Sequence, residues 1–168
     1  MTSTIKGKLI AIIIITIILT GCAAEVEPGG DPVAAIVSDR RLMIEQQPQG
    51  NRAYVTDVPD TMTLVDAEAL YVLAHDHLAG EYIAGLAVGD EVIIQLETGS
   101  MVYTVTGIER FTAVDPGDPY GNLIDQAGYE LSSTQIYWML TGDADRLILQ
   151  TCFDNSTGRM FVIAERIG

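Results

Sequence analysis

Short apolar runs separated by turn residues follow one another from residue 61 to the end of the chain. They are rich in Val, Ile, Leu, Thr and Tyr, and this pattern is typical of β-strands. The clearest pair flanks Thr98-Gly99-Ser100, where a glycine-containing turn between two β-branched runs predicts a hairpin. The six strongest runs read "TMTLVD", "LYVLAH", "EVIIQLE", "MVYTVTGIERF", "RLILQTC" and "RMFVIAER".

Helical signals are few and short. Leu78, Tyr82 and Leu86 recur every four residues in "LAGEYIAGLAVGDEV", which suits one or two helical turns ending at Gly89-Asp90. The segment "SSTQIYWML" predicts a second short helix with Ser132 or Ser133 as its N-cap, and we expect Tyr137 and Trp138 within it to be core residues. With strand pieces and loops expected between residues 32 and 60, the total is seven or eight strands. This count predicts an all-β barrel or sandwich.

The N-terminus has the pattern of an export signal. Lys6 and Lys8 precede the apolar stretch Leu9–Leu19, which is too short to span a bilayer and is typical of a secretory signal peptide. The following "LTGC" resembles a bacterial lipobox, which implies cleavage before Cys22 and lipidation of its thiol. An ordinary signal or anchor that happens to end near a cysteine is the alternative.

These features divide the chain into three parts. We expect a lipoprotein signal peptide over residues 1–21, a flexible tether rich in Pro, Gly and acidic residues over 22–32, and a barrel domain over 33–168. The lipid on Cys22 would hold the protein outside the cytoplasmic membrane, at the bacterial cell envelope.

The charge excludes some partners. The chain carries a formal net charge of −14, and its only lysines lie in the signal peptide, so residues 22–168 hold seven arginines against 23 acids, a net charge of −16. Nucleic-acid binding needs clustered basic residues, so we expect no nucleic-acid partner. Adsorption to anionic lipid is disfavoured for the same reason, and membrane attachment should come from the lipid anchor.

One thiol is left for chemistry. If Cys22 carries lipid, Cys152 is an unpaired cysteine in an exported protein, and such a residue is a candidate reactive thiol. A cysteine nucleophile needs a proton-transfer group and a donor for the oxyanion. His75 and His77 are the only histidines, and Arg159 opens the apolar run after Cys152. A thiol-redox protein is disfavoured because the chain has no C-x-x-C pair.

In order along the chain, these residues resemble the motifs of the sortases, the bacterial cysteine transpeptidases. The matching segments are "VLAH" with His75, "LAGEYIAGLAVGD", the hairpin, "LILQTC" with Cys152 and "GRMFVIAE" with Arg159, from about Thr61 to the C-terminus. The resemblance implies a closed β-barrel of about eight strands with one or two short helices. It also implies an enzyme that cleaves a peptide sorting signal through a Cys152 thioester and passes the acyl group to an amine.

The same resemblance assigns the site. Cys152 is the nucleophile, His75 the acid and Arg159 the stabilising cation, while Thr151 is a candidate for substrate or oxyanion support. Ala74 stands where most sortases have glycine, so His77 stays open as an alternative to His75. We expect a monomer that uses a protein or peptide substrate, an amine acceptor and no cofactor.

Less specific interpretations compete at each position. Cys152 could be a buried structural thiol, Arg159 an ion-pair partner of Asp154, Thr151 a packing residue, and Asp76 a turn residue rather than a partner of a histidine. A metal site is poorly supported, and "DPGDPYGNLID" lacks the ordered EF-hand pattern for calcium. The alternative function is a catalytically inactive sortase-like lipoprotein that acts as a binding or structural module.

Overall fold

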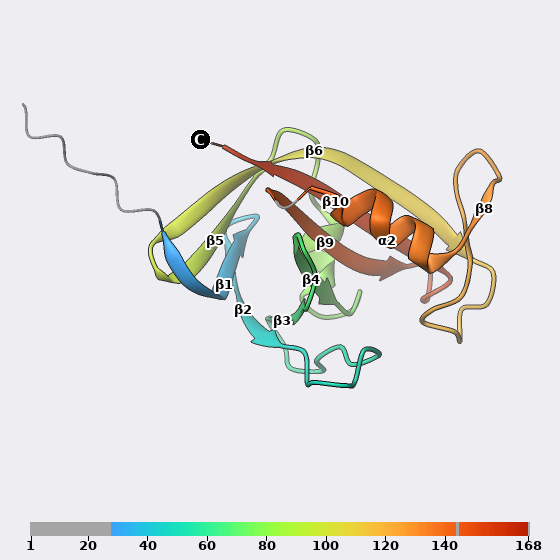
Figure 1. The fold of residues 1–168 in the computed structure, drawn as a ribbon, viewed down its shortest axis with the longest axis horizontal. Coiled ribbons are helices and arrows are strands. Elements are labelled where there is room, and N and C mark those ends of the chain that lie inside the picture. Colours follow the sequence, from blue (N-terminus) through green and yellow to red (C-terminus); the bar gives the residue numbers. More distant parts are fainter. Residues whose placement is uncertain (1–27, 144, 168) are drawn as a thin grey trace, which may run out of the picture.

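Ten strands form one sheet in the computed structural model, which describes residues 28–143 and 145–167 (Figure 1). The strands are β1 Gly29–Val37, β2 Arg40–Gln46, β3 Thr61–Val65, β4 Leu70–Ala74, β5 Glu91–Thr98, β6 Ser100–Ala113, β7 Leu123–Ile124, β8 Glu130–Leu131, β9 Arg146–Phe153 and β10 Gly158–Arg166. Eight of them close a barrel in the order β10-β9-β4-β3-β2-β1-β5-β6, because β6 also pairs with β10. The expectation of a closed all-β barrel of about eight strands is therefore confirmed.

Two parallel pairings interrupt an otherwise antiparallel barrel. β2 runs parallel to β3, and β4 runs parallel to β9 from Leu70↔Leu147 to Ala74↔Thr151. The predicted hairpin is present as β5 and β6, joined at Gly99 with a φ of +100°. β7 and β8 extend the sheet beyond β6 as a short flap outside the ring.

Two helices accompany the barrel. α1 (Gly80–Ala84) packs its flanking and central apolar residues Ala79, Ile83 and Leu86 into the barrel core. Of the predicted series, Leu86 is buried, whereas Leu78 and Tyr82 are only half-buried and the adjacent Ala79 and Ile83 are buried instead. None of the helices among the described residues is long and apolar enough to cross a membrane.

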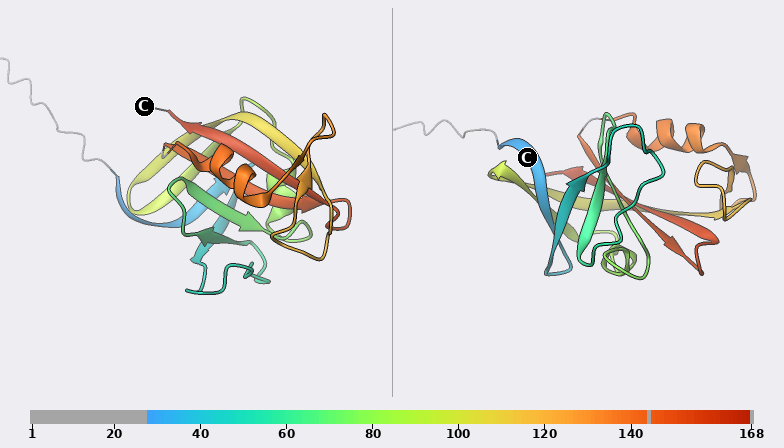
Figure 2. Two further views of the ribbon diagram at one scale, coloured as in Figure 1. Left: turned by 45° about the vertical axis from the view of Figure 1, so that its right-hand side comes forward. Right: turned by 90° about the horizontal axis from the view of Figure 1, so that it is seen from below.

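The second helix, α2 (Ser133–Thr141), lies across the outside of the barrel over β9 and β10 (Figure 2). Ser132 caps it through a capping box with Gln135, as one of the two predicted caps. The expectation that Trp138 is a core residue was wrong, because it is 58% exposed. A helix lying on a sheet buries only one face, and in α2 that face carries Ile136 and Leu140.

The barrel begins earlier than the sequence suggested. β1 starts at Gly29 and pairs with β5 from Gly29↔Thr98, so the last four residues of the predicted 22–32 tether belong to a strand. Register shifts around Pro32 accommodate its missing N–H, which hides this strand from sequence patterns. The signal peptide, Cys22 and the rest of the predicted tether lie outside the described residues.

The core has two parts. The barrel interior holds one cluster, which includes the inward side chains of β9, Leu147 and Leu149, both fully buried. A second cluster lies between the outer face of the barrel and α2, and it contains Ile148, Phe111 and Phe161. The rings of Phe111 and Phe161 meet edge to face. Since β9 contributes to both clusters, its alternate side chains are fixed on both faces.

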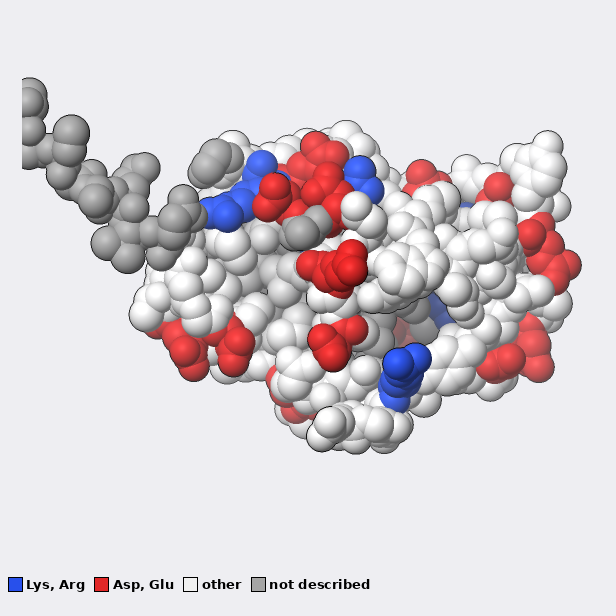
Figure 3. Space-filling view, viewed as in Figure 1, with Lys and Arg blue, Asp and Glu red and all other residues white. Residues whose placement is uncertain are grey.

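Acidic side chains dominate the outside of this core. On the face shown in Figure 3 they form several separate patches, with few arginines between them. This distribution agrees with the strongly negative net charge of the chain.

Candidate active site

Cys152 and Arg159 are direct cross-strand partners. They face each other in the antiparallel register of β9 and β10, on either side of the turn formed by Asp154, Asn155 and Ser156, all with positive φ. Paired residues of neighbouring strands point to the same side of a sheet. On that side Cys152 follows Ile148 along β9, so the thiol and the guanidinium both lie on the outer face of the barrel.

The parallel pairing of β4 with β9 brings His75 to the same end of the barrel. Ala74 is in register with Thr151, so His75 leaves β4 where Cys152 continues β9. The side chain of His75 is 34% exposed and its Nε2 lies 3.4 Å from Oδ1 of Asp57 in the loop between β2 and β3. The structure therefore brings His75 to the hairpin that carries Cys152 and Arg159, although His75 belongs to a distant part of the sequence.

His77 lies beside His75 but further out. Its ring centroid is 5.6 Å from that of His75, and its side chain is 69% exposed. Asp76, which the sequence offered as a partner for either histidine, places Oδ1 3.1 Å from Nδ1 of His77. His75 is thus the more buried of the two histidines and the one that directly follows β4.

The loop that carries Asp57 is held by polar contacts. The backbone N–H of Thr56, which is 1% exposed, donates to Oγ1 of Thr63 at 2.8 Å, and Oγ1 of Thr56 accepts from the N–H of Val58 at 3.2 Å. Both residues that flank Asp57 in sequence are thus fixed. Sequence analysis missed Asp57, because no local pattern links a loop carboxylate to a histidine that follows a later strand.

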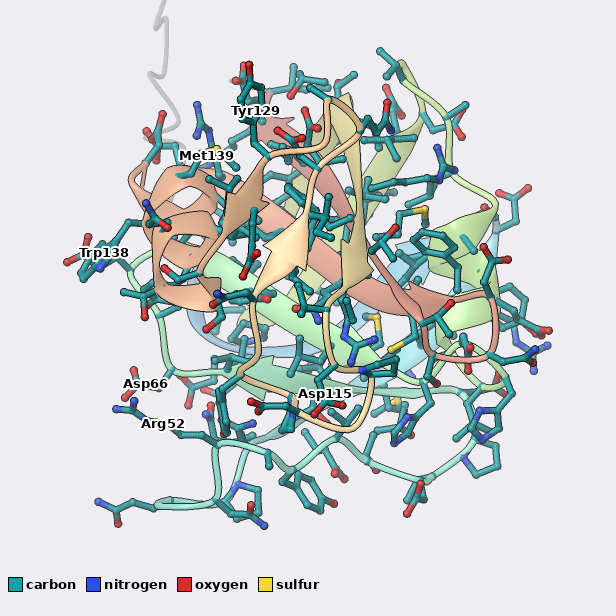
Figure 4. The ribbon with its side chains drawn as sticks, turned by 90° about the vertical axis from the view of Figure 1, so that its right-hand side faces the viewer. Arg52, Asp66, Asp115, Tyr129, Trp138 and Met139 are labelled. Carbon is teal, nitrogen blue, oxygen red and sulfur yellow. The ribbon has the colours of Figure 1, made fainter. Side chains whose placement is uncertain are left out.

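Arg159 is anchored by backbone carbonyls. Its Nη1 donates to the carbonyl oxygens of Ser156 at 2.6 Å and Gly158 at 3.1 Å, and its Nη2 donates to that of Pro116 at 3.5 Å. Pro116 belongs to the loop between β6 and β7, whose neighbouring Asp115 is labelled in Figure 4. Among the described residues Arg159 forms no ion pair, so the alternative of a salt bridge with Asp154 is not seen.

The Cys152 thiol is half-buried, and its pKa is raised above the ordinary value. Burial is the main cause, because it disfavours the charged thiolate, and the carboxylate of Asp76 raises the pKa further. The positive charge of Arg159 and a hydrogen bond with Ser156 act in the opposite direction. At neutral pH the thiol is thus the major form and the thiolate a minor one.

Thr151 lies on the opposite face of β9 from Cys152. It is 1% exposed, and its Oγ1 has no hydrogen-bond partner among the described residues. A hydroxyl in this position packs between the strand and α1. This placement favours the packing role that the sequence left open beside oxyanion support.

The described residues contain no group of three or more His, Cys, Asp or Glu side chains placed to hold a metal ion. The carboxylates of the loop between β6 and β7 instead accept backbone N–H groups, as Asp115 does from Gly117 and Asp118 from Tyr120, both at 2.9 Å.

The fold is that of the sortases. No protein-family model matches this sequence, and neither does any curated protein sequence. Among solved structures, sortase A of Listeria monocytogenes superposes with a TM-score of 0.52 at 14% identity, covering 82% of this chain and 88% of that one. A sortase D5 transpeptidase of Clostridium perfringens gives a TM-score of 0.52 at 16% identity over 86% and 83% of the two chains. Sortase C of Streptococcus pneumoniae gives 0.52 at 14% over 82% and 68%.

Arg159 and Asp76 carry opposite charges near Cys152, so removing one or the other should shift the pH midpoint of Cys152 alkylation in opposite directions. Arg159→Met removes a lowering influence and should move the pH midpoint of Cys152 alkylation upward, whereas Asp76→Asn removes a raising influence and should move it downward. Intact-mass labelling with limiting iodoacetamide from pH 6 to 10 measures both. Asp154→Asn on the neighbouring turn is the control and should leave the midpoint in place, and shifts of one sign in all three variants would contradict this electrostatic arrangement.

The orphaned hydroxyl of Thr151 predicts a gain in stability on its removal. Thr151→Val keeps the side-chain shape and should raise the free energy of unfolding by ~1 kcal/mol, because the buried polar group costs free energy without a partner. Urea denaturation measures this change, and the alkylation rate of Cys152 should stay within twofold of the wild type. A loss of thiol reactivity that Thr151→Ser does not show would instead assign the hydroxyl a part in the reaction.

Proposed function

We propose that this chain is a sortase-type cysteine transpeptidase that cleaves a peptide sorting signal and transfers the acyl group to an amine. The observation that carries the proposal is the in-register pair Cys152↔Arg159 next to the β4 end that leads into His75, on a barrel of the sortase fold. Fold likeness alone carries no activity, so the roles below come from the chemistry of these side chains.

In the first half of the reaction, Sγ of the Cys152 thiolate attacks the scissile carbonyl carbon and forms a tetrahedral oxyanion. The C–N bond then breaks, and protonated His75 gives its proton to the departing amine. The products are a Cys152 thioester and a free amine, with His75 left neutral. Thiolate with protonated His75 carries the same number of protons as thiol with neutral His75, so the resting site reaches the reactive form by internal proton transfer.

Arg159 suits the stabilising role because its guanidinium is fixed and only partly engaged. Of its five N–H donors, three are given to backbone carbonyls, two from Nη1 and one from Nη2. The Nε donor and one of the two Nη2 donors have no hydrogen-bond partner within the described part of the chain. These donors can hold the oxyanion or the thiolate.

In the second half, an acceptor amine attacks the thioester carbon and gives its extra proton to His75. The C–S bond breaks, the thiolate is released, and a new amide bond joins acyl group and acceptor. Water in place of the amine gives hydrolysis, so the same site supports endopeptidase activity when no acceptor is present.

The proposal places this activity outside the cytoplasmic membrane, on a monomer tethered by lipid on Cys22. Support for the tether comes from the sequence, namely the two lysines, the apolar stretch and "LTGC". β1 begins at Gly29, which leaves only a short segment between Cys22 and the barrel.

The second candidate is an inactive sortase-like lipoprotein that binds a partner at the cell surface. The observation in its favour is the burial of the Cys152 thiol, which raises its pKa and keeps it protonated at neutral pH. A structural thiol would show the same property, so the raised pKa alone does not separate the two candidates.

The two histidines offer a matched test of the proposed reaction. A pool of unstructured peptides is incubated with the full-length protein, with and without hydroxylamine as the acceptor amine, and the products are read by mass spectrometry. We expect peptide hydroxamates with the acceptor and hydrolysis products without it. His75→Ala should lower the rate by ~10²–10⁴-fold through loss of acid–base catalysis, Cys152→Ala should abolish it, and His77→Ala should stay within a few-fold of the wild type.

Two outcomes would contradict the proposal. Neither product from the pool, with Cys152 intact, would favour the inactive lipoprotein. Equal losses in His75→Ala and His77→Ala would reject the assignment of the acid to His75.

A further inference from the structure

We propose that Gly80, the first residue of α1, is a positioning residue that sets His75 against Cys152, an inference that rests on the roles proposed for these two residues. The chain turns back immediately after His75. The carbonyl oxygen of His75 accepts the N–H of Leu78 at 3.0 Å and the N–H of Gly80 at 2.9 Å. Gly80 therefore holds the backbone of His75 directly.

Gly80 also touches β9. A β-carbon on this residue would lie 2.5 Å from the carbonyl oxygen of His75 and 2.8 Å from its carbonyl carbon, and it would overlap Oγ1 of Thr151. Real β-carbons do not approach other heavy atoms this closely, so only glycine fits here. Gly80 thus lies directly between His75 and Thr151, the residue before Cys152.

The two neighbours differ in how firmly they are held. Thr151 lies inside the sheet, in register with Ala74 of β4 on one side and Met160 of β10 on the other. His75 lies beyond the end of β4, and the hydrogen bonds to its carbonyl come from the turn itself. A methyl group added at position 80 would thus displace His75 rather than β9.

The helix itself cannot retreat to relieve the crowding. Ala79 and Ile83 are fully buried in the barrel core, and Gly80 is buried between them. Because α1 is fixed in the barrel, Gly80 is fixed too, and it sets the distance between His75 and Cys152. A change of about 1 Å in such a separation costs on the order of 10²-fold in rate.

Gly80→Ala tests this inference, with Gly85→Ala, at the C-cap of the same helix, as the matched control. A β-carbon at Gly85 would meet only the carbonyl oxygens of Tyr82 at 3.6 Å and Glu81 at 3.8 Å, which are ordinary contacts. The readout is the rate of Cys152 alkylation by iodoacetamide at pH 7, which requires no knowledge of the natural substrate. We expect His75→Ala and Gly80→Ala each to lower this rate by at least about tenfold, because both disturb proton transfer from the Cys152 thiol to His75, while Gly85→Ala leaves it unchanged.

The double variant with His75→Ala separates positioning from a general structural effect. If Gly80 acts through His75, adding Gly80→Ala to His75→Ala should cause no further change in the alkylation rate. A further change as large as in the wild-type background would overturn the inference, because the methyl group would then disturb Cys152 directly.

A second variant covers the case in which Gly80→Ala does not fold. Gly80→Ala with Thr151→Ala removes the overlap with Oγ1 but keeps the contact with the His75 carbonyl, so it should fold and still show the altered rate. A wild-type rate in this variant would show that Gly80 is needed only to accommodate Thr151. If His75→Ala itself leaves the rate unchanged, the proposed role of His75 fails; if only Gly80→Ala leaves it unchanged, the positioning role alone fails.

Discussion

The parallel pairing of β4 with β9 is the constraint on which the candidate site depends. In two strands that run side by side in the same direction, residues at matching positions lie at the same end of the sheet. In this chain His75, which follows β4, and Cys152, near the end of β9, are each one step beyond the register pair Ala74↔Thr151. The fully buried side chains of Val72, Leu147 and Leu149 hold the pair together from inside the barrel. Burial of each such side chain contributes ~1.5–3 kcal/mol.

The same pair is also fixed from outside. The hydroxyl of Tyr71 on β4 donates to Oε1 of Gln150 on β9, and burial raises the pKa of this phenol far above its ordinary value, so it stays protonated and able to donate. α2 then covers Ile148 and Phe161 with Ile136 and Leu140. A nucleophile mounted on a strand that is packed on both faces keeps its position more firmly than one on a loop.

Several loops surround His75 and Cys152 at this end of the barrel, and different contacts hold each of them. Arg159 joins the turn after β9 to the loop after β6 through the carbonyls of Ser156 and Pro116. Asp57 approaches His75 from the loop that connects the parallel strands β2 and β3. The fold therefore brings His75, with Asp57 beside it, to the hairpin that carries Cys152 and Arg159, although these segments are far apart in the sequence.

Local patterns predicted most of the fold, and the residues proposed for the site came from the order of motifs along the chain. Alternating and β-branched runs marked β3, β4, β5, β6, β9 and β10, and the glycine at 99 marked the hairpin, because these signals depend on neighbouring residues alone. The start of β1 was missed, since Pro32 and two glycines conceal a strand that exists only through its pairing with β5. Trp138 was misplaced because helix length alone does not tell which face meets the sheet.

Contacts between distant segments escaped sequence reasoning altogether. The contacts of Asp57 with His75, and of Gly80 with His75 and Thr151, exist only in the folded chain. The raised pKa of Cys152 results mainly from burial, which no local motif predicts. The motifs therefore suggested which groups to examine, and the tertiary structure showed how they are held and that burial disfavours the Cys152 thiolate.

The measurement that most directly tests whether Cys152, His75 and Arg159 form one site is a double-mutant cycle on the thiol. The alkylation rate of Cys152 is measured across pH 5 to 9 by intact mass in the wild type, His75→Ala, Arg159→Ala and the double variant. If the three residues act together, each single change alters the pH profile, and the double change differs from the sum of the two by a coupling energy of ~0.5–3 kcal/mol. Profiles that do not respond to either change would show that Cys152 is a packed structural thiol and that the barrel does not use it for catalysis.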